Sequence, residues 1–255
     1  MVDNSIGLYT IVRREVTRFC RIWTQTLLPS TITTMLYFIV FGGLIGSRIG
    51  KMDEFSYMEY IIPGLVMMAI ITNSYMNVST SFFISKFQRN IEEMLVSPLS
   101  NNVIIWGYVF GGMLRGIIVG TLVAIVSLFF VKLPMYSLAI IFLIGTLTAL
   151  LFSIAGLING ILAKKFDDID IIPTFILTPL IYLGGVFYSV YLLPSSWQKV
   201  MHANPIFHMI NAFRYGMLGR SDVEISLAVS VIIILIISLY YLALWLLNKG
   251  VGIKT

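Results

Sequence analysis

The chain alternates between long apolar runs and short polar stretches. Runs of about 20 mostly apolar residues are long enough to cross a bilayer as helices. Their aliphatic residues do not alternate strictly with polar ones, as they would in the strands of a β-barrel. Six runs qualify, covering residues 27–46, 61–84, 103–131, 137–162, 172–190 and 225–247. The pattern predicts an all-α, polytopic membrane protein with six transmembrane helices in one domain, 1–255.

Two segments outside these runs also show helical periodicity. In residues 6–26, apolar residues such as Val12 and Val16 follow one face and Arg14 and Arg18 follow another. This predicts an amphipathic interfacial helix on the inner membrane surface, either as a basic anchor near anionic lipid or as a transmission element beside a partner.

The second of these segments, residues 191–224, is too polar to span the membrane. Within it, Asn204 and Pro205 suit the N-cap and first position of a short helix. We expect this helix to lie on the outer leaflet or to dip into it.

The polar stretch FQRNIEEMLVSPLS, residues 87–100, interrupts two apolar runs and must protrude from the membrane. Its charges fall on one side of a short helix and Ile91, Met94 and Leu95 fall on the other, with Pro98 ending the helix. An amphipathic helix outside the bilayer favours docking to a soluble partner.

Composition agrees with membrane insertion and sets the orientation. The chain is 58% hydrophobic and 11% charged, with a mean hydropathy of +0.93. With both ends cytoplasmic, ten basic residues lie inside: Arg13, Arg14, Arg18, Arg21, Lys86, Arg89, Lys164, Lys165, Lys249 and Lys254. Six lie outside: Arg48, Lys51, Lys132, Lys199, Arg214 and Arg220. Cytoplasmic loops favour Lys and Arg, so both termini are expected inside.

Three further expectations follow from composition and from the N-terminal sequence. The net charge of +5 is mostly this orientation signal, and we expect no nucleic-acid partner. The single cysteine, Cys20, excludes an intramolecular disulfide and a cysteine-based metal cluster. The first apolar run begins late and no cleavage site precedes it, so we expect no cleaved signal peptide.

No catalytic engine is evident in the sequence. The phosphate loop G-x-x-x-x-G-K-[ST] is missing, as are H-E-x-x-H and G-x-S-x-G, so we expect neither bound ATP nor an enzyme of these classes. His202 and His208 would not share one face of a helix, and we expect no metal site there. The six runs contain almost no acid, which disfavours a proton- or sodium-coupled transporter. Arg115 is the one charge within a run, and both a packing role and a substrate or gating role stay open.

Two further patterns are candidates for a role in helix packing or transport. Small residues at four-residue spacing let transmembrane helices approach closely; they are Gly107, Gly111, Gly112, Gly116, Gly120, Gly156 and Gly160. Neutral polar residues form three stripes that suit helix–helix hydrogen bonding or the lining of a substrate pathway. The stripes comprise Thr26, Ser30, Thr33 and Tyr37; Asn73, Asn77, Thr80 and Ser81; and Thr174, Thr178 and Tyr182.

Taken in order, these features resemble the ABC-2-type transport permeases. The match rests on the amphipathic N-terminal helix, six spans, Pro63-Gly64 in span 2, RNIEEMLVSPLS after it, and NPIFHMINAFRYGMLG at 204–219. It extends essentially from end to end and is most similar to the bacterial inner-membrane permeases that export drugs, polysaccharides or nodulation factors. Single motifs are weak, but their order and spacing are specific.

The resemblance implies a half-transporter. Two permease copies would pair with two separate ATP-binding subunits, which carry the ATP and magnesium and drive export, so that this chain binds no cofactor itself. The segment 86–98 would be the cytoplasmic coupling helix that docks on the ATPase, with its role carried by Arg89, Asn90, Glu92, Glu93, Met94, Leu95 and Pro98. Spans 1, 2 and 5 would line the pathway. The alternative function is an ATP-independent secondary transporter or channel.

Overall fold

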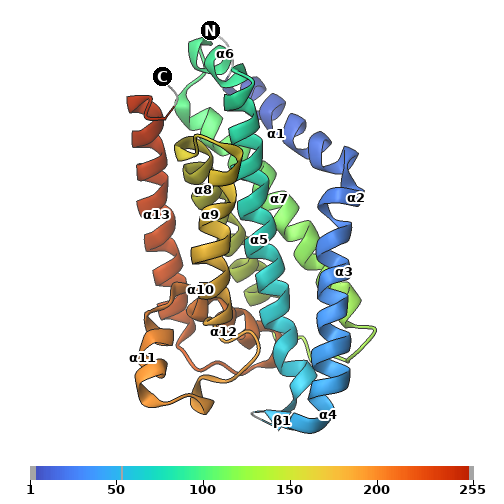
Figure 1. The fold of residues 1–255 in the computed structure, drawn as a ribbon. Helices are drawn as coiled ribbons and strands as arrows, with labels where there is room; N and C mark the ends of the chain where they lie inside the picture. The colour runs from blue at the N-terminus through green and yellow to red at the C-terminus, as the bar shows by residue number, and fades with distance from the viewer. Residues whose placement is uncertain (1–3, 53, 253–255) are drawn as a thin grey trace.

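The structure, a computed structural model, describes residues 4–52 and 54–252, apart from the side chains of residues 44, 47 and 95. Long helices lie side by side in one elongated bundle, and α1 crosses it obliquely at one end (Figure 1). The long helices are α5 (Tyr57–Phe87), α7 (Asn101–Ser127), α8 (Leu138–Leu162) and α13 (Ile225–Lys249). The predicted all-α, polytopic membrane fold is confirmed.

The N-terminal segment and the first apolar run form a series of helical pieces rather than one regular helix. They are α1 (Asn4–Arg21), α2 (Trp23–Thr26), α3 (Leu28–Tyr37), the π-helix η1 (Phe38–Ile45) and α4 (Gly46–Ile49). A two-stranded antiparallel hairpin follows, made of β1 (Lys51–Met52) and β2 (Phe55–Ser56), with Lys51 opposite Ser56. The hairpin closes the end of the bundle opposite to α6 (Asn90–Val96). We call these two ends the α6 end and the hairpin end.

Among the described residues, five helical stretches are long and apolar enough to cross a bilayer. They are Trp23–Gly43, Tyr57–Phe87, Asn101–Ser127, Leu138–Leu162 and Ile225–Lys249. Each coincides with one of the six apolar runs of the sequence, which leaves the run at 172–190 without a span of this kind.

At 172–190 the helix begins earlier and stops earlier than predicted. It consists of α9 (Phe166–Ile172), the π-helix η2 (Pro173–Leu177) and α10 (Thr178–Tyr182). At 1.5 Å per residue these pieces extend about 25 Å, less than the roughly 30 Å of a hydrocarbon core. Two prolines, Pro173 and Pro179, remove backbone donors from the helix. A shorter, broken helix therefore replaces the predicted full-length fifth span.

Helix α5 is the centre of the bundle. Its apolar window is 83% buried, against 44% for α8, 39% for α7 and 17% for α13. A capping box starts it: the Ser56 hydroxyl accepts a hydrogen bond from the Glu59 amide (3.3 Å), and the Glu59 carboxylate accepts one from the Ser56 amide (2.7 Å). Because this cap lies upstream of residue 61, Pro63 sits inside the helix rather than in its first turn.

Glycines in α7 and α8 let these helices press against α5. Added Cβ atoms at Gly112, Gly116 and Gly120 would meet the α5 side chains Val78, Ser74 and Ile70. A Cβ at Gly160 would lie 2.9 Å from the carbonyl oxygen of Ser79, and one at Gly156 would meet that of Tyr75. These five glycines thus sit where two helix backbones approach within one protomer.

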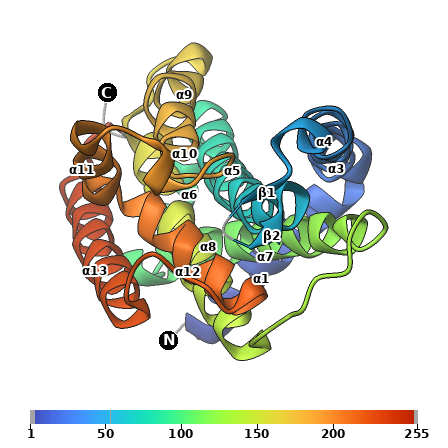
Figure 2. The same cartoon turned by 90° about the horizontal axis from the view of Figure 1, so that it is seen from below.

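The polar segment before the last span forms a cap over the hairpin end. It contains the 3-10 helix η3 (Val190–Leu192), α11 (Ser195–Ala203) and α12 (Pro205–Leu218). The predicted N-cap is confirmed, since the Asn204 side chain accepts a hydrogen bond from the Ile206 amide at 3.0 Å. Figure 2 shows α12 lying across the bundle, where it contacts α5, α8 and α13.

Replacing Gly156 with alanine is expected to destabilise the bundle. The new methyl group would press on a backbone carbonyl, which moves only if α5 shifts, and overpacking of this kind costs about 1–3 kcal/mol. The measurement is the thermal unfolding midpoint in detergent. Gly145→Ala in the same helix is the matched control, because its nearest neighbours lie at an ordinary 3.6 Å. Equal midpoints for the two variants would contradict the packing argument.

Candidate functional site

Helix α6 projects beyond the bundle between the ends of α5 and α7 (Figure 1). The chain enters it through Arg89, whose left-handed backbone (φ 62°) breaks the helix after α5. It leaves through Ser97, in extended conformation, and Pro98. The last turn of α5 is fixed in place, because the Lys86 ammonium donates to the carbonyl oxygens of Ile161 (2.8 Å) and Ala163 (2.6 Å) at the end of α8.

Contrary to the sequence prediction for a docking helix, the two faces of α6 are not both accessible. Ile91 is only 1% exposed and belongs to the protein's own core, with Met94 packed against the same cluster. The expectation that this apolar face is free for a partner is therefore wrong for Ile91. The outward face carries Glu92 and Glu93, and Val96 is 88% exposed.

The other predicted coupling residues surround this outward face. Arg89, Asn90 and Pro98 are exposed, whereas the side chain of Leu95 lies outside the described residues. The accessible surface of α6 is thus mainly polar and acidic.

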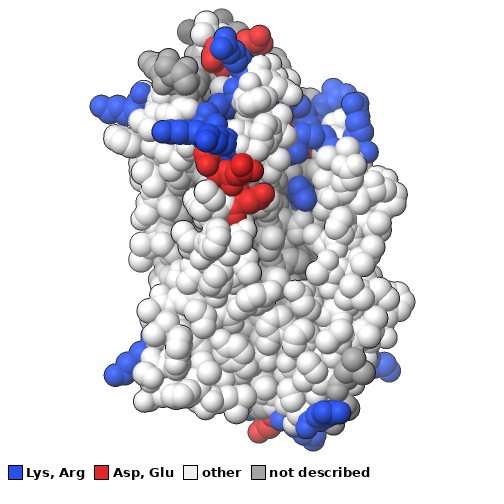
Figure 3. Space-filling view, in the orientation of Figure 1, with Lys and Arg blue, Asp and Glu red and all other residues white. Residues whose placement is uncertain are grey.

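A second acidic group lies at the start of α9, toward the α6 end. Asp167 and Asp170 are exposed there, and Figure 3 shows acidic side chains gathered below the basic ones in this region. The Asp168 carboxylate accepts hydrogen bonds from the amides of Lys164 (2.8 Å) and Lys165 (2.9 Å). These backbone hydrogen bonds lower the pKa of Asp168, so it stays ionised as a helix cap.

Helix α1 is seated on α7 through two glycines. Its buried face is formed by Ile11, Glu15 and Phe19, at intervals of one helical turn. A Cβ added at Gly107 would lie 2.5 Å from Ile11, and one at Gly111 would lie 2.5 Å from the Cβ of Glu15. The close approach places a carboxylate, rather than an aliphatic side chain, at the middle of this interface.

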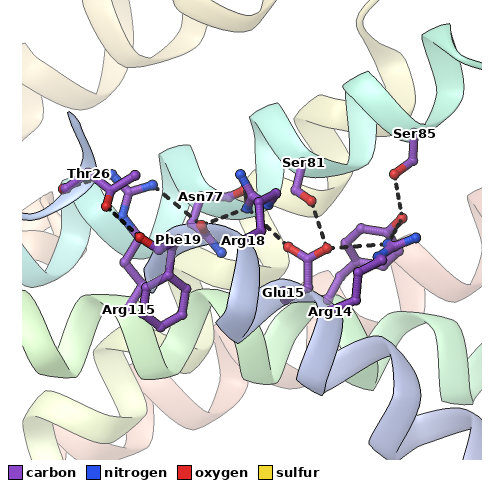
Figure 4. Close-up of polar contacts among 10 residues, drawn as sticks. Arg14, Glu15, Arg18, Phe19, Thr26, Asn77, Ser81, Ser85 and Arg115 are labelled. Atoms are coloured by element: carbon purple, nitrogen blue, oxygen red, sulfur yellow. Dashed lines mark hydrogen bonds and ion pairs between the residues drawn. The ribbon is translucent and has the colours of Figure 1, made fainter. Parts of the chain in front are cut away.

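Glu15 is the centre of a buried ion-pair network. Its side chain is 1% exposed and contacts Arg14 (3.2 Å) and Arg18 (3.0 Å), as Figure 4 shows. The Ser81 hydroxyl of α5 donates to the same carboxylate at 2.8 Å. Arg14 also donates to the hydroxyl of Tyr108 in α7 at 2.6 Å. One carboxylate therefore connects α1 to both α5 and α7.

The network continues inward to Arg115 of α7. Arg18 donates to the Asn77 side chain at 2.8 Å, and Arg115 reaches the same oxygen at 3.4 Å. Arg115 also donates to the carbonyl of Thr26 (3.1 Å) and to Asn73 (3.3 Å). Within the part of the chain that the structure describes, Arg115 has no ion-pair partner. Neutral oxygens alone solvate this guanidinium inside the bundle (Figure 4).

The predicted polar stripes divide into two groups. Thr26, Asn73 and Asn77 gather around Arg115, and the hydroxyl of Ser30 exchanges hydrogen bonds with Asn73 at 3.1–3.2 Å. Nearer the hairpin end, the rings of Tyr37 and Tyr182 both pack on Phe187, with centroids 5.9 and 5.8 Å away. Four other stripe residues join neither group: Thr33 and Thr174 are exposed, and Thr80 and Thr178 are half-buried.

The histidines do not form a joint site. His208 is 8% exposed, and its Nε2 lies 2.7 Å from the backbone carbonyl of His202 rather than from its ring. Among the described residues, no three His, Cys, Asp or Glu side chains are grouped as ligands for a metal ion.

Comparison with known proteins agrees with this geometry. The family model of the ABC-2 type transporter matches residues 7–218. The chain is 54% identical to the inner membrane transport permease YadH of Escherichia coli K12 over 250 residues, which cover 98% of both chains. It is also 24% identical to nodulation protein J of Neorhizobium galegae, over 97% of this chain and 95% of that protein. This chain belongs to the ABC-2 type transporter family. It is a multi-pass inner-membrane protein and a transport permease subunit.

Two features of this ABC-2 permease were not anticipated. Glu15 was overlooked because neighbouring arginines gave it the appearance of a surface residue. The signal was its register, four residues after Ile11 and four before Phe19, on the apolar face. Val96 was overlooked because helical periodicity does not specify which face of a short helix turns back onto the bundle.

Replacing Glu15 with glutamine is expected to loosen α1 from the bundle. Two guanidinium groups lose their counter-charge; since they are 40% and 29% exposed, the cost is about 2 kcal/mol, below the roughly 3–5 kcal/mol of a fully buried pair. Amide hydrogen exchange in α1 should then accelerate roughly thirtyfold.

The control is Glu54→Gln, which removes the exposed pair of Glu54 with Arg220 (3.7 Å) at the hairpin end. Exposed pairs contribute at most about 1 kcal/mol, and exchange in α1 should not change. Unchanged α1 exchange in Glu15→Gln would show that the network does not hold the helix.

Proposed function

We propose that this permease is the membrane subunit of an ATP-driven exporter, and that α6 transmits the motion of a separate ATP-binding subunit to the bundle. The proposal rests on the form of α6. It is a short acidic helix that projects from the membrane domain, and short connections join it to two long spans. Family membership supports it, because ABC-2 type transporters combine a permease with an ATP-binding cassette.

The anchoring of α6 makes it suitable as a lever. Ile91 is held in the core shared by α7, α8 and α13, so a push on Glu92 or Glu93 moves the helix as a body. Only Gln88 and Arg89 separate α5 from α6, and only the four residues from Ser97 to Ser100 separate α6 from α7. A force on the acidic face is thereby passed to α5 and α7.

ATP hydrolysis is assigned to the partner. The sequence carries no phosphate loop, and we propose that ATP and magnesium are bound by the cassette subunit, two copies of which serve two permeases. The gradient-driven alternative requires an acid free to take up a proton or bind sodium. The carboxylate of Glu15, the buried acid of α1, is instead engaged by two arginines and by the Ser81 hydroxyl.

Orientation and assembly complete the proposal. The α6 end carries most of the basic residues, so it is assigned to the cytoplasm together with both termini. A second copy of this chain is proposed to face α3 and the segment formed by η2 and α10, which lie on opposite sides of α5 (Figure 2). Both expose apolar residues, such as Leu36 (55%) in α3 and Phe175 (73%) in η2. Tyr37 and Tyr182 would then line a pathway between the protomers.

The experiment is recovery of the ATP-binding subunit with the permease from its native membrane. Reversing the charge at Glu92 and Glu93 with lysine should lower the recovered subunit and the associated ATP hydrolysis at least tenfold, since an acidic face would meet its partner as a basic one. Val96→Asp should weaken recovery in the same direction, because a charge replaces an exposed apolar contact.

The matched control is Glu54→Lys combined with Glu224→Lys. Both residues are exposed acids at the hairpin end, so net charge changes equally while α6 is untouched. Normal recovery from this control, with loss in the α6 variant at equal expression, supports the proposal. A permease that is recovered without any ATPase, whatever its sequence at 92–93, would restore the gradient-driven transporter or channel.

A further inference from the structure

A cavity of about 610 Å³ opens between α1 and the last turns of α5 at the α6 end. Four arginines line it: Arg13, Arg14, Arg18 and Arg21. The single acid in its wall is Glu15, which is almost completely buried and engaged by Arg14, Arg18 and Ser81. The wall therefore carries an excess of three positive charges toward the open space.

The donors of these arginines are only partly used by the protein. Every hydrogen bond from Arg14 and Arg18 to the described residues leaves from Nη2. The guanidinium groups of Arg13 and Arg21 are exposed and form no hydrogen bond or ion pair with the described chain. Four guanidinium groups, each planar and permanently charged, thus surround one space. Their geometry suits a phosphate group, whose oxygens arginine binds bidentately.

The cavity also lies where a headgroup would be found. Two apolar residues, Ile22 and Ile84, contribute to its wall beside the arginines. Next along the chain, Trp23 (53% exposed), Leu28 (41%) and Ile32 (48%) continue an apolar surface toward the middle of the bundle. Figure 3 shows this transition from basic residues at the α6 end to an uncharged belt. A charged head in the cavity can thus have its alkyl chain along α2 and α3.

We propose that this cavity binds the phosphate headgroup of an alkyl amphiphile that comes from the inner leaflet. The inference rests on the orientation given under the proposed function, since only a cytoplasmic α6 end faces that leaflet. A phosphate held there competes with Glu15 for Arg14 and Arg18. Occupancy of the cavity therefore acts on the ion pairs within α1, and on Arg18 and Glu15, whose hydrogen bonds to Asn77 and Ser81 fasten α1 to α5.

The test is equilibrium binding of dodecyl phosphate to the purified full-length permease in neutral detergent, with dodecyl maltoside and inorganic phosphate as comparison ligands. Arg13→Gln combined with Arg21→Gln is the variant of choice, because neither side chain has a hydrogen-bond or ion-pair partner among the described residues whose loss would loosen α1. Loss of two charges near the headgroup should weaken binding of dodecyl phosphate about thirtyfold. The affinity of the unaltered protein should also fall with added salt.

Arg48→Gln combined with Lys51→Gln is the matched control, since it removes two exposed cations at the hairpin end. The proposal predicts unchanged binding in this control, no competition by dodecyl maltoside, and much weaker binding of inorganic phosphate. Equal losses in the two variants would mean attraction by net charge alone and would overturn the site. Inorganic phosphate binding as tightly as dodecyl phosphate would overturn the amphiphile.

The binding assay needs no ATP-binding subunit, so the two proposals fail separately. If dodecyl phosphate does not bind but the ATP-binding subunit is recovered normally, the headgroup site is refuted and the exporter proposal stands. Binding present in a permease that recovers no ATPase leaves the site and removes the ATP-driven mechanism.

Discussion

The structure depends on how closely helix backbones can approach in a solvent that does not drive apolar surfaces together. Lipid chains are as apolar as leucine, so transmembrane helices associate through van der Waals contact and hydrogen bonds rather than through a hydrophobic drive. In this protein the contact is supplied where α7 and α8 lack side chains opposite Ser74 and Tyr75 of α5. The same device on another face of α7, at Gly107 and Gly111, seats α1. One kind of contact thus builds the bundle and places the helix that carries its ion pairs.

The seat of α1 explains why a carboxylate is tolerated at a buried position. A charge removed from water is stable only when it is paired and its remaining oxygens are hydrogen-bonded. Glu15 meets this condition through Arg14, Arg18 and Ser81, which come from two helices. The arrangement is specific as well as stabilising, because a shift of α1 by one turn would separate Glu15 from Ser81, Arg14 from Tyr108 and Arg18 from Asn77. Helix α1 is therefore more than an anchor on the lipid surface.

Sequence patterns predicted the features that depend on composition and local chemistry. The apolar runs, the cap at Asn204, and the family resemblance each reflect a short-range or cumulative property of the chain. What the sequence left open depends on tertiary contacts. The length of an apolar run did not reveal that Pro173 and Pro179 shorten the fifth helix, nor that Ile91 turns inward.

The glycine pattern and the neutral polar stripes show the same difference between what the sequence predicts and what tertiary contacts decide. Small residues identified the close contacts, but which neighbour each glycine meets follows from the rotation of its helix. Neutral polar residues were grouped by periodicity, whereas the structure gathers Asn73 and Asn77 around Arg115 and separates Tyr37 and Tyr182 from them. Arg115 drew attention as a lone charge, and only its neighbours explain how that charge is solvated.

The bond from Lys86 to the end of α8 has a mechanical consequence. It holds the last turn of α5 to two carbonyls of α8, two residues before the chain bends toward α6. Displacement of α6 is therefore delivered to a cross-braced pair of spans, which must tilt together instead of sliding past each other. The pivot is confined to Gln88 and Arg89, where the backbone leaves helical geometry. If the braced pair tilts about its α6 end, the hairpin end is displaced most, because it lies a full bundle length away.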